Sequence, residues 1–399
     1  MSNALNFNTN DGYTFLLSLE TRGIKLGLQR TKRLLKACGN PEKALKSIQI
    51  IGTNGKGSTA ATLSSILLNA GFSVGMYTSP HLVDLSERIQ VTGLCISIKY
   101  VNNFINKFKN DIQKLECTFF ETLTVLALTF FKDSSIDIAI LETGLGGRYD
   151  SVTASKPFLQ LFTKISMDHN NILGDSIEEV SHEKAYAIQE KVPCISVNQD
   201  QKVKFILDKL AKEQETTINY ISTEYGEEYS SPLLGHHQQQ NIMLAVSAAQ
   251  TITTIDNQHI TKGIETTTWP GRVEVVNELP TVIFDVCHND DSIIAFCNTI
   301  KSLNHIGQKI LIISIQRTKV FESAINKINS NFSKIIFTQL NERMYTAKDL
   351  QTLFHEHNNT QIITKPNQAI VKTLNTINNS DMLAIIGSHY WGELINKNF

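Results

Sequence analysis

Short runs of apolar, mostly β-branched residues alternate along the chain with stretches in which apolar positions recur at helical spacing. The runs that we predict as strands are residues 47–52, 73–78, 136–144, 193–197, 281–286, 309–315, 334–339 and 381–388. Residues 58–71 are one of the intervening stretches and predict a helix. Strands of a parallel sheet read as continuous apolar runs because helices cover both faces of the sheet. The pattern therefore predicts an α/β protein built on parallel sheets.

The length and one break in the pattern predict two domains. The chain has 399 residues, above the roughly 100–200 of a typical domain. The helical pattern ends near Ile264, and Pro270 and Gly271 interrupt the chain before a new series of strands begins. We therefore expect a first domain at residues 1–268 and a smaller α/β domain at residues 269–399. Such an interface between domains commonly holds ligands.

Composition excludes several classes of partner. Lys and Arg number 37 and Asp and Glu 38, so the net charge of -1 gives no field that attracts nucleic acid or an anionic membrane. No apolar run approaches the roughly 20 residues of a membrane helix. The six cysteines are scattered without a CxxC pair, which suits a reducing compartment. We expect a cytoplasmic enzyme or binding protein.

The sequence "IIGTNGKGSTAATLSSILLNAGF" follows the order strand, glycine loop, helix that a phosphate-binding loop requires. The strict pattern G-x-x-x-x-G-K-[ST] is not met, because Ile50 replaces its first glycine and Gly57 separates Lys56 from Ser58. A tight turn with a solvated lysine is the alternative. The candidate phosphate-binding residues are Thr53, Asn54, Gly55, Lys56, Gly57 and Ser58.

Two more polar groups follow predicted strands. Glu142 ends an apolar run before a glycine-rich turn, and Asp168 and His169 end another. Because the carboxyl ends of parallel strands meet at one rim, Lys56, Glu142 and His169 are expected to gather there. A carboxylate at this position suits Mg²⁺, which prefers oxygen ligands and often bridges phosphates. Taken singly, Glu142 could instead cap a turn or pair with Arg148, and a single histidine is often structural.

Taken together, these segments resemble the folylpolyglutamate synthase and dihydrofolate synthase family, a branch of the ATP-dependent Mur-type ligases. The similarity spans nearly the whole chain and includes "GTNGKGS", "LETGLGGRYD", "MDHNNILG", "HEKA", "HHQQQN", "WPGR" and "FDVCHN" in this order. The resemblance implies a Mur ligase architecture, with a P-loop ATPase domain followed by a Rossmann-like domain that binds glutamate and closes over ATP. It also implies that ATP converts a carboxylate to an acyl phosphate, which the amine of L-glutamate then attacks.

The resemblance assigns roles around the nucleotide. It implies two Mg²⁺ ions, one bound by Ser79 and Glu142 and a second bound by His169. Lys184 matches a lysine that the family carbamylates, which would give a carboxylate beside the metal; an unmodified surface lysine is the alternative. The catalytic residues are expected to be Lys56, Glu142, His169 and Lys184. The other ATP contacts are expected to be Asn241 near adenine, Arg272 at the phosphates, and Asp285 with His288 at the ribose.

The same resemblance suggests a pocket for dihydropteroate or a reduced folate. Its residues are expected to be Leu26, Thr118, Phe120, Glu121, Asp150 and Ser151. An aromatic ring can stack on the flat pterin, and a carboxylate can accept from its N–H groups. Core packing is the alternative role of Phe120.

The chain departs from the family pattern at four places. Residues 152–155 lack an asparagine, Tyr186 replaces a glycine, Cys287 and Asp290 replace alanine and proline, and residues 316–319 lack a "DKD" motif. We expect a monomeric, bifunctional dihydrofolate and folylpolyglutamate synthase. The alternatives are a folylpolyglutamate synthase that does not accept dihydropteroate and, in a different class, a switch that hydrolyses ATP without ligation.

Overall fold

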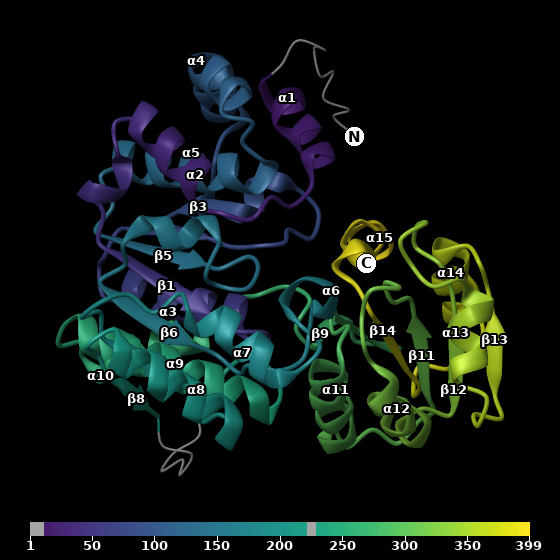
Figure 1. Ribbon diagram of the computed structural model, residues 1–399. Helices are drawn as coiled ribbons and strands as arrows, with labels where there is room; N and C mark the ends of the chain where they lie inside the picture. Colours follow the sequence, from purple (N-terminus) through teal and green to yellow (C-terminus); the bar gives the residue numbers. More distant parts are fainter. Residues whose placement is uncertain (1–11, 222–228) are drawn as a thin grey trace.

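The computed structural model describes residues 12–221 and 229–399, and it contains two sheets, each covered by helices (Figure 1). The first sheet has eight strands in the order β4-β3-β2-β5-β1-β6-β7-β8, and the second has six in the order β13-β12-β11-β14-β10-β9. The chain therefore forms two α/β units, as the alternating pattern predicts.

The first sheet is parallel except for β3 and β4, which pair antiparallel at one edge. Its strands are β1 (Ser47–Ile51), β2 (Val74–Tyr77), β3 (Ile89–Val91), β4 (Leu94–Cys95), β5 (Ile138–Glu142), β6 (Leu159–Phe162), β7 (Cys194–Ser196) and β8 (Ile218–Tyr220). β1 lies between β5 and β6, and every residue of β1 and β5 is buried. This central position explains the continuous apolar run of "SIQII".

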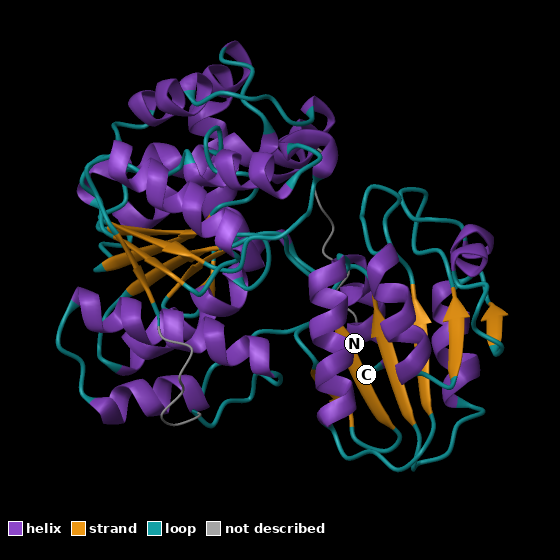
Figure 2. Ribbon diagram, turned by 60° about the horizontal axis from the view of Figure 1, so that its bottom comes forward, coloured by secondary structure: helices purple, strands orange, loops and turns teal. Residues whose placement is uncertain are grey.

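Helices cover both faces of the first sheet, as Figure 2 shows. On one face pack α1 (Gly12–Ser18), η1 (Leu19–Arg22), α2 (Gln29–Ala37), α4 (Ile98–Lys114), α5 (Phe119–Asp133), α7 (Ile177–Ala185) and α8 (Gln201–Glu213). On the other pack α3 (Lys56–Asn69), α9 (His236–Ile252) and α10 (Asn257–Glu265). Four short helices lie in the connections: η2 (Pro41–Ala44), η3 (Leu85–Arg88), η4 (Ser151–Ser155) and α6 (Asn170–Leu173). Helix α3 is buried along most of its length, so the glycine loop before it is held on a fixed support.

The second sheet is parallel except for its edge strand β9. Its strands are β9 (Glu274–Asn277), β10 (Thr281–Asp285), β11 (Lys309–Ile313), β12 (Lys334–Phe337), β13 (Thr360–Ile362) and β14 (Met382–Ile386). The helices are α11 (Asp290–Ser302), η5 (Glu322–Ala324), α12 (Ile325–Asn331), α13 (Ala347–Leu353), α14 (Pro366–Leu374), η6 (His389–Trp391) and α15 (Gly392–Asn398). Buried apolar side chains pack on both faces of this sheet.

The expected domain junction between residues 268 and 269 falls in the loop from α10 to β9. Trp269 packs with the core of the first unit, and its indole lies so close to Gly57 that a Cβ there would come within 2.7 Å of Nε1. The first strands of the second unit begin only at Glu274. Trp269 therefore belongs spatially to the glycine loop of the first unit.

Candidate functional site

The glycine loop joins β1 to the N-terminus of α3 and depends on two glycines with positive φ. Gly52 has φ 153° and Gly55 has φ 91°. A Cβ on Gly52 would collide with the side chain of Thr163, and one on Gly55 would collide with that of Asn241. The amides of Thr53 and Asn54 both donate to the carbonyl oxygen of Lys164. Thr53 and Asn54 therefore do not offer their amides to phosphate oxygens. The amides that remain for phosphate are those of Gly55 to Ser58 at the start of α3, which have no hydrogen-bond partner within the helix.

Lys56 and Ser58 supply the side chains of this loop. The Lys56 amine lies 3.2 Å from the carbonyl oxygen of Gly52 and 3.0 Å from that of Thr53, folded back over the loop. The Ser58 hydroxyl is buried and has no hydrogen-bond partner. A buried hydroxyl without a partner costs free energy unless a ligand satisfies it, so Ser58 suits a phosphate oxygen or a metal ion.

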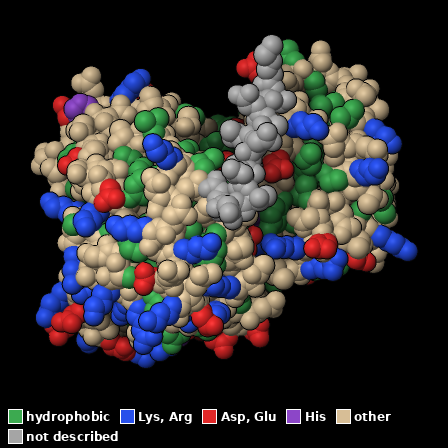
Figure 3. All heavy atoms as spheres, turned by 90° about the horizontal axis from the view of Figure 1, so that it is seen from above, with side chains coloured by type: hydrophobic (Ala, Val, Ile, Leu, Met, Phe, Trp, Pro, Cys, Tyr) green, Lys and Arg blue, Asp and Glu red, His purple; other side chains and the backbone are tan. Residues whose placement is uncertain are grey.

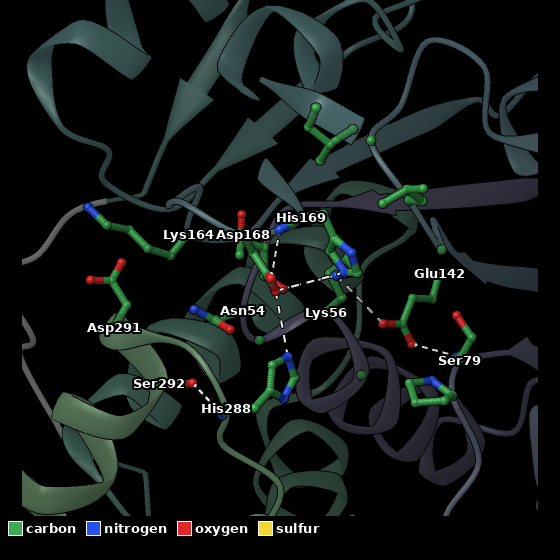
Figure 4. A pocket seen from close by; sticks show the side chains of 18 of the residues that line it. Asn54, Lys56, Ser79, Glu142, Lys164, Asp168, His169, His288, Asp291 and Ser292 are labelled. Carbon is green, nitrogen blue, oxygen red and sulfur yellow. Dashed lines mark hydrogen bonds and ion pairs between the residues drawn. The ribbon is translucent and has the colours of Figure 1, made fainter. Parts of the chain in front are cut away.

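Glu142, at the end of β5, lies beside this loop. One of its oxygens accepts from the amide of Ser79 at 3.2 Å, and the other is 4.0 Å from the Lys56 amine. Burial raises the pKa of Glu142, whereas the charge of Lys56 and the Ser79 hydrogen bond lower it. In Figure 4, Glu142 and Ser79 lie on one side of Lys56 and Asp168 lies on the other. A carboxylate and a hydroxyl at this place are the hard oxygen donors that Mg²⁺ uses beside phosphates, so these residues fit the predicted ion.

Asp168 connects the two units. Its carboxylate lies 2.7 Å from the Lys319 amine, 3.6 Å from His288 Nε2 and 3.2 Å from the Asn289 amide nitrogen. Burial by itself raises the pKa of Asp168, but the hydrogen bond and charge of His288 and the charge of Lys319 lower it well below its ordinary value. Asn289 also exchanges two amide hydrogen bonds with Asn54 of the glycine loop. The start of α11 is thereby attached to the loop of the first unit.

His169, the expected ligand of a second Mg²⁺, also faces Lys319. Its Nε2 lies 3.3 Å from the Lys319 amine, and its backbone has φ 56° at the start of α6. Burial lowers the pKa of His169 to about 3, and the charge of Lys319 acts in the same direction. Among residues 12–221 and 229–399, no group of three or more His, Cys, Asp or Glu side chains is placed to hold a metal.

Lys184 is buried on α7 and donates to the carbonyl oxygen of Gly52 at 2.8 Å. Burial lowers the pKa of Lys184 to about 7, and the nearby charge of Lys56 contributes to the shift. The surface alternative for this lysine is therefore wrong. Tyr186, which replaces a glycine of the family pattern, also has a structural role. Its ring lies 4.5 Å from the guanidinium carbon of Arg148, and the ring of Tyr149 lies 5.0 Å from the same carbon.

The predicted nucleotide contacts from α9 and the second unit reach the same region. The side chain of Asn241 lies against Gly55, and its amide nitrogen donates to the side-chain oxygen of Gln238 at 3.0 Å. Arg272 donates to the carbonyl oxygen of Gly271. The Asp285 carboxylate accepts from the amides of Val273 and Cys287, both at 2.7 Å, and each oxygen keeps a second lone pair. His288 was expected near Asp285 at the ribose, but its Nε2 faces the carboxylate of Asp168 at 3.6 Å.

Several expected folate residues use their polar atoms within the protein. Thr118 and Glu121 form the capping box of α5, and Glu121 also accepts from Arg30 at 3.0 Å. The Ser151 hydroxyl lies 2.6 Å from that of Thr124. Leu26 is 62% exposed, on the loop before α2. These contacts show that Thr118 and Glu121 also have a structural role.

Asp150 and Phe120 are the residues of this pocket best suited to a flat, polar ring. The Asp150 carboxylate accepts from the amides of Gly144, Leu145 and Val152 at 2.9–3.0 Å. Burial nevertheless raises the pKa of Asp150 to about 6. The Phe120 ring packs against Gly144, where a Cβ would collide with it, and lies 5.8 Å from the ring of Tyr77. The ring is half-buried, so one part packs in the core and the rest faces the pocket.

A cavity of about 1330 Å³ adjoins the glycine loop, Glu142, Asp168, His169 and the pocket of Phe120 and Asp150, but not Lys184. It extends between the two units, and Figure 3 shows the hollow between the two lobes from above. Every other predicted site residue lines it, from Leu26 and Phe120 through the glycine loop to Arg272 and His288. Lys184 lies behind the loop instead. The cavity exceeds the roughly 300–1,000 Å³ of common ligand pockets, so it can hold more than one substrate.

Sequence analysis did not predict Arg88, Lys319 and His389, which line this cavity, or Asn289, which contacts Asn54 and Asp168. Arg88 donates to His81 of the "TSPH" segment at 2.9 Å. Lys319 lies within the departure from the family pattern at residues 316–319. Its position shortly after strand β11, at the rim of the second sheet, was a signal that could have identified it.

Comparisons with known proteins agree with this geometry. The Mur ligase middle domain family matches residues 50–249, and the "Mur ligase, glutamate ligase domain" family matches residues 271–389. The chain is 31% identical over 410 residues to the dihydrofolate synthase/folylpolyglutamate synthase of Bacillus subtilis, covering 94% of this chain and 95% of that one. It is also 31% identical over 324 residues to the Escherichia coli protein of the same name, covering 77% and 76% of the two chains.

Solved structures show the same architecture. E. coli FolC in complex with DHPP and ADP superposes with a TM-score of 0.89 at 26% identity, and the match covers 97% of both chains. A structure from Yersinia pestis, complexed with AMPPNP and a Mn ion, gives a TM-score of 0.86 at 24% identity over 97% of this chain and 98% of that one. Within the described residues, no helix has the length and apolar character to cross a membrane. The chain belongs to the family of dihydrofolate synthases and folylpolyglutamate synthases, ATP-dependent ligases with the Mur ligase fold.

Proposed function

We propose that this protein uses ATP to join L-glutamate to dihydropteroate and to reduced folates through an acyl phosphate. The observation that carries the proposal is that one cavity is lined by the glycine loop, by Glu142 and by the pocket of Phe120 and Asp150. This arrangement allows a folate carboxylate to approach the terminal phosphate of ATP. It is supported by relatives named for both synthase activities.

In the first step a carboxylate oxygen attacks the terminal phosphorus, and ADP leaves. Lys56 and the first amides of α3 hold the phosphates, and Arg272 from the second unit adds a bidentate donor. Glu142 and Ser79 would hold Mg²⁺, which would offset charge on the phosphates and the acceptor carboxylate. In the second step the amine of glutamate attacks the acyl carbon, phosphate leaves, and the amine loses a proton as the amide forms.

Lys184 is proposed to carry a carbamate. A lysine whose pKa is near 7 is largely neutral at slightly alkaline pH, and the neutral amine is the form that reacts with CO₂. The amine lies behind the glycine loop at Gly52, so the modified side chain would place a carboxylate beside the phosphate site. The second Mg²⁺ expected at His169 remains a prediction, and the contact with Lys319 argues against it.

Glutamate is proposed to enter from the second unit, which matches the glutamate ligase domain family. Cationic side chains from both units, including Arg88 and Arg343, line the cavity and suit its two carboxylates. A monomer and a cytoplasmic location remain predictions. Light scattering after size-exclusion chromatography tests the first, and fractionation of cells tests the second.

The decisive experiment gives the purified protein ATP, Mg²⁺ and glutamate with either dihydropteroate or a reduced folate, and identifies the products by mass. Glutamate addition to both substrates supports the bifunctional synthase. Addition to the reduced folate alone would favour the folylpolyglutamate synthase alternative. Release of ADP with no ligated product would favour the ATP-hydrolysing switch and refute the proposal.

A further inference from the structure

Lys319 brings a positive charge from the second unit into the phosphate site of the first. It lies in the connection after β11, is 8% exposed and lines the cavity. Its amine is 2.7 Å from Asp168 Oδ1 and 3.3 Å from His169 Nε2. Both partners belong to the segment that was expected to bind a second divalent cation.

The contact with His169 excludes a metal on the same atom. An ammonium group has three donors and no acceptor, so in this contact Nε2 must accept through its single lone pair. A metal ion would need that same lone pair. In addition, a divalent cation placed there would lie next to the ammonium and be repelled by it. Lys319 and a metal ion are therefore alternative occupants of this position.

The backbone around Lys319 holds the side chain in place. The Lys319 amide donates to the carbonyl oxygen of Gln316 at 3.1 Å, which closes a turn. Gln316 forms an isolated bridge with Met344, and Arg317 donates to the Met344 carbonyl oxygen at 2.9 Å. The lysine thus extends from an anchored turn toward Asp168, whose carboxylate is also contacted by Asn289.

We propose that Lys319 takes the place of the second divalent cation, so that the protein holds one divalent ion with its nucleotide rather than two. Ser79 and Glu142 would hold this ion, and the ammonium of Lys319 would supply the second positive charge near the acceptor carboxylate. The role of the Lys319 charge beside the acceptor carboxylate rests on the proposed function. The number of ions bound can be measured without any turnover.

The test counts Mn²⁺ bound to the full-length protein after removal of metal with a chelator. Protein and the non-hydrolysable analogue AMPPNP are held at equal concentrations, Mn²⁺ is titrated, and bound ions are measured by electron paramagnetic resonance. We expect one ion per chain for the wild type and two for Lys319→Met. Lys348→Met is the matched control, because Lys348 is an exposed residue of α13 that does not line the cavity, and this variant should bind one ion. Two ions in the wild type, or one in Lys319→Met, would overturn the inference.

A second variant keeps the test decisive if Lys319→Met does not fold, as judged by circular dichroism. His169→Ala should leave the number and affinity of bound Mn²⁺ within twofold of the wild type, because His169 is not a ligand in this arrangement. A decrease of one ion in His169→Ala would show that the histidine binds metal and would refute the inference. If the purified protein forms no ligated product, the proposed function is refuted, but the numbers of Mn²⁺ ions bound by the wild type and by the variants do not change.

Discussion

The amine of Lys184 donates a 2.8 Å hydrogen bond to the carbonyl oxygen of Gly52, although the two residues are 132 positions apart in the sequence. Gly52 is the first residue after β1, so helix α7 supports the phosphate-binding loop from behind. A Cβ on Gly147 would come within 2.6 Å of the Lys184 carbonyl oxygen, so the turn after β5 packs on the same helix. Lys184 is therefore held between two loops of the site.

Modification of Lys184 by CO₂ should depend on pH. Burial lowers the pKa of this lysine to about 7, so the reactive neutral amine predominates above pH 7 and is lost as the pH falls below it. In bicarbonate buffer we expect a covalent CO₂ adduct on Lys184 at pH 8 and at least about tenfold less at pH 6. Chemical trapping followed by peptide mass spectrometry measures the adduct. Exposed Lys348 is the internal control, and no adduct on Lys184 at pH 8 would contradict carbamylation.

Lys56→Ala should abolish ligation while leaving the fold intact. The Lys56 amine contacts only the loop and Glu142 among the described residues, but it is positioned to neutralise developing phosphate charge. Loss of such a charge typically lowers kcat by about 10²-fold or more. A product assay and circular dichroism check the two parts of the prediction. Exposed Lys32→Ala is the control, and normal turnover in Lys56→Ala would refute the phosphate role.

Phe120→Ala should separate folate binding from nucleotide binding. The ring packs beside Gly144 and Tyr77 and faces the cavity away from the glycine loop, so its loss removes a stacking surface for the pterin. We expect KM for the folate to rise about tenfold, because aromatic contacts of this kind contribute about 0.5–1.5 kcal/mol beyond area burial. The dissociation constant of ADP should stay within twofold. An unchanged KM would mean that Phe120 serves the core alone.

The first sheet and its rim could be predicted because they follow from local pattern. The apolar runs of β1 and β5 are buried on both faces, and chain direction then puts Lys56 and Glu142 at one edge. Short edge strands such as β4 and β13 were not predicted, because their residues are mostly exposed and carry no continuous apolar run.

The contacts between the units could not be predicted from local pattern. The Lys319 and Asp168 pair joins residues 151 positions apart, and its formation depends on how the two units sit together. The capping box of Thr118 and Glu121, in contrast, could be predicted from local sequence, because T-x-x-E before an apolar run is a known pattern at the start of a helix. That pattern would have revealed their structural role beside the substrate role implied by the resemblance.

Tyr186→Gly, which restores the family residue, should have a small effect. The exposed ring covers Arg148, and exposed contacts of this kind contribute about 0.5–1 kcal/mol. We expect the free energy of unfolding to fall by about 1–2 kcal/mol, because the glycine also follows the last turn of α7 and has greater backbone freedom. Tyr186→Phe should retain most of the stability. Urea denaturation checks both variants, and an equal loss in the two would point to the hydroxyl instead of the ring.

The Asp168 and Lys319 pair should couple strongly in a double-mutant cycle. Both side chains are under 10% exposed, and removal of one partner leaves a buried charge, so Asp168→Asn and Lys319→Met should each cost about 3 kcal/mol in the free energy of unfolding. The double variant should cost less than either single one, because the single variants each leave an unpaired buried charge and the double variant leaves none.

The pH dependence of the same cycle has a definite sign. The folded pKa of Asp168 lies below its ordinary value, because the contacts with His288 and Lys319 outweigh burial. Its stabilising contribution is therefore present above the unfolded pKa of about 4 and declines only at lower pH. Urea denaturation at pH 7, 5 and 3.5 measures this. The exposed pair of Lys25 and Glu116, 3.3 Å apart, is the control and should couple by less than about 1 kcal/mol. Additive losses in the Asp168 and Lys319 cycle would show that the contact does not hold the two units together in solution.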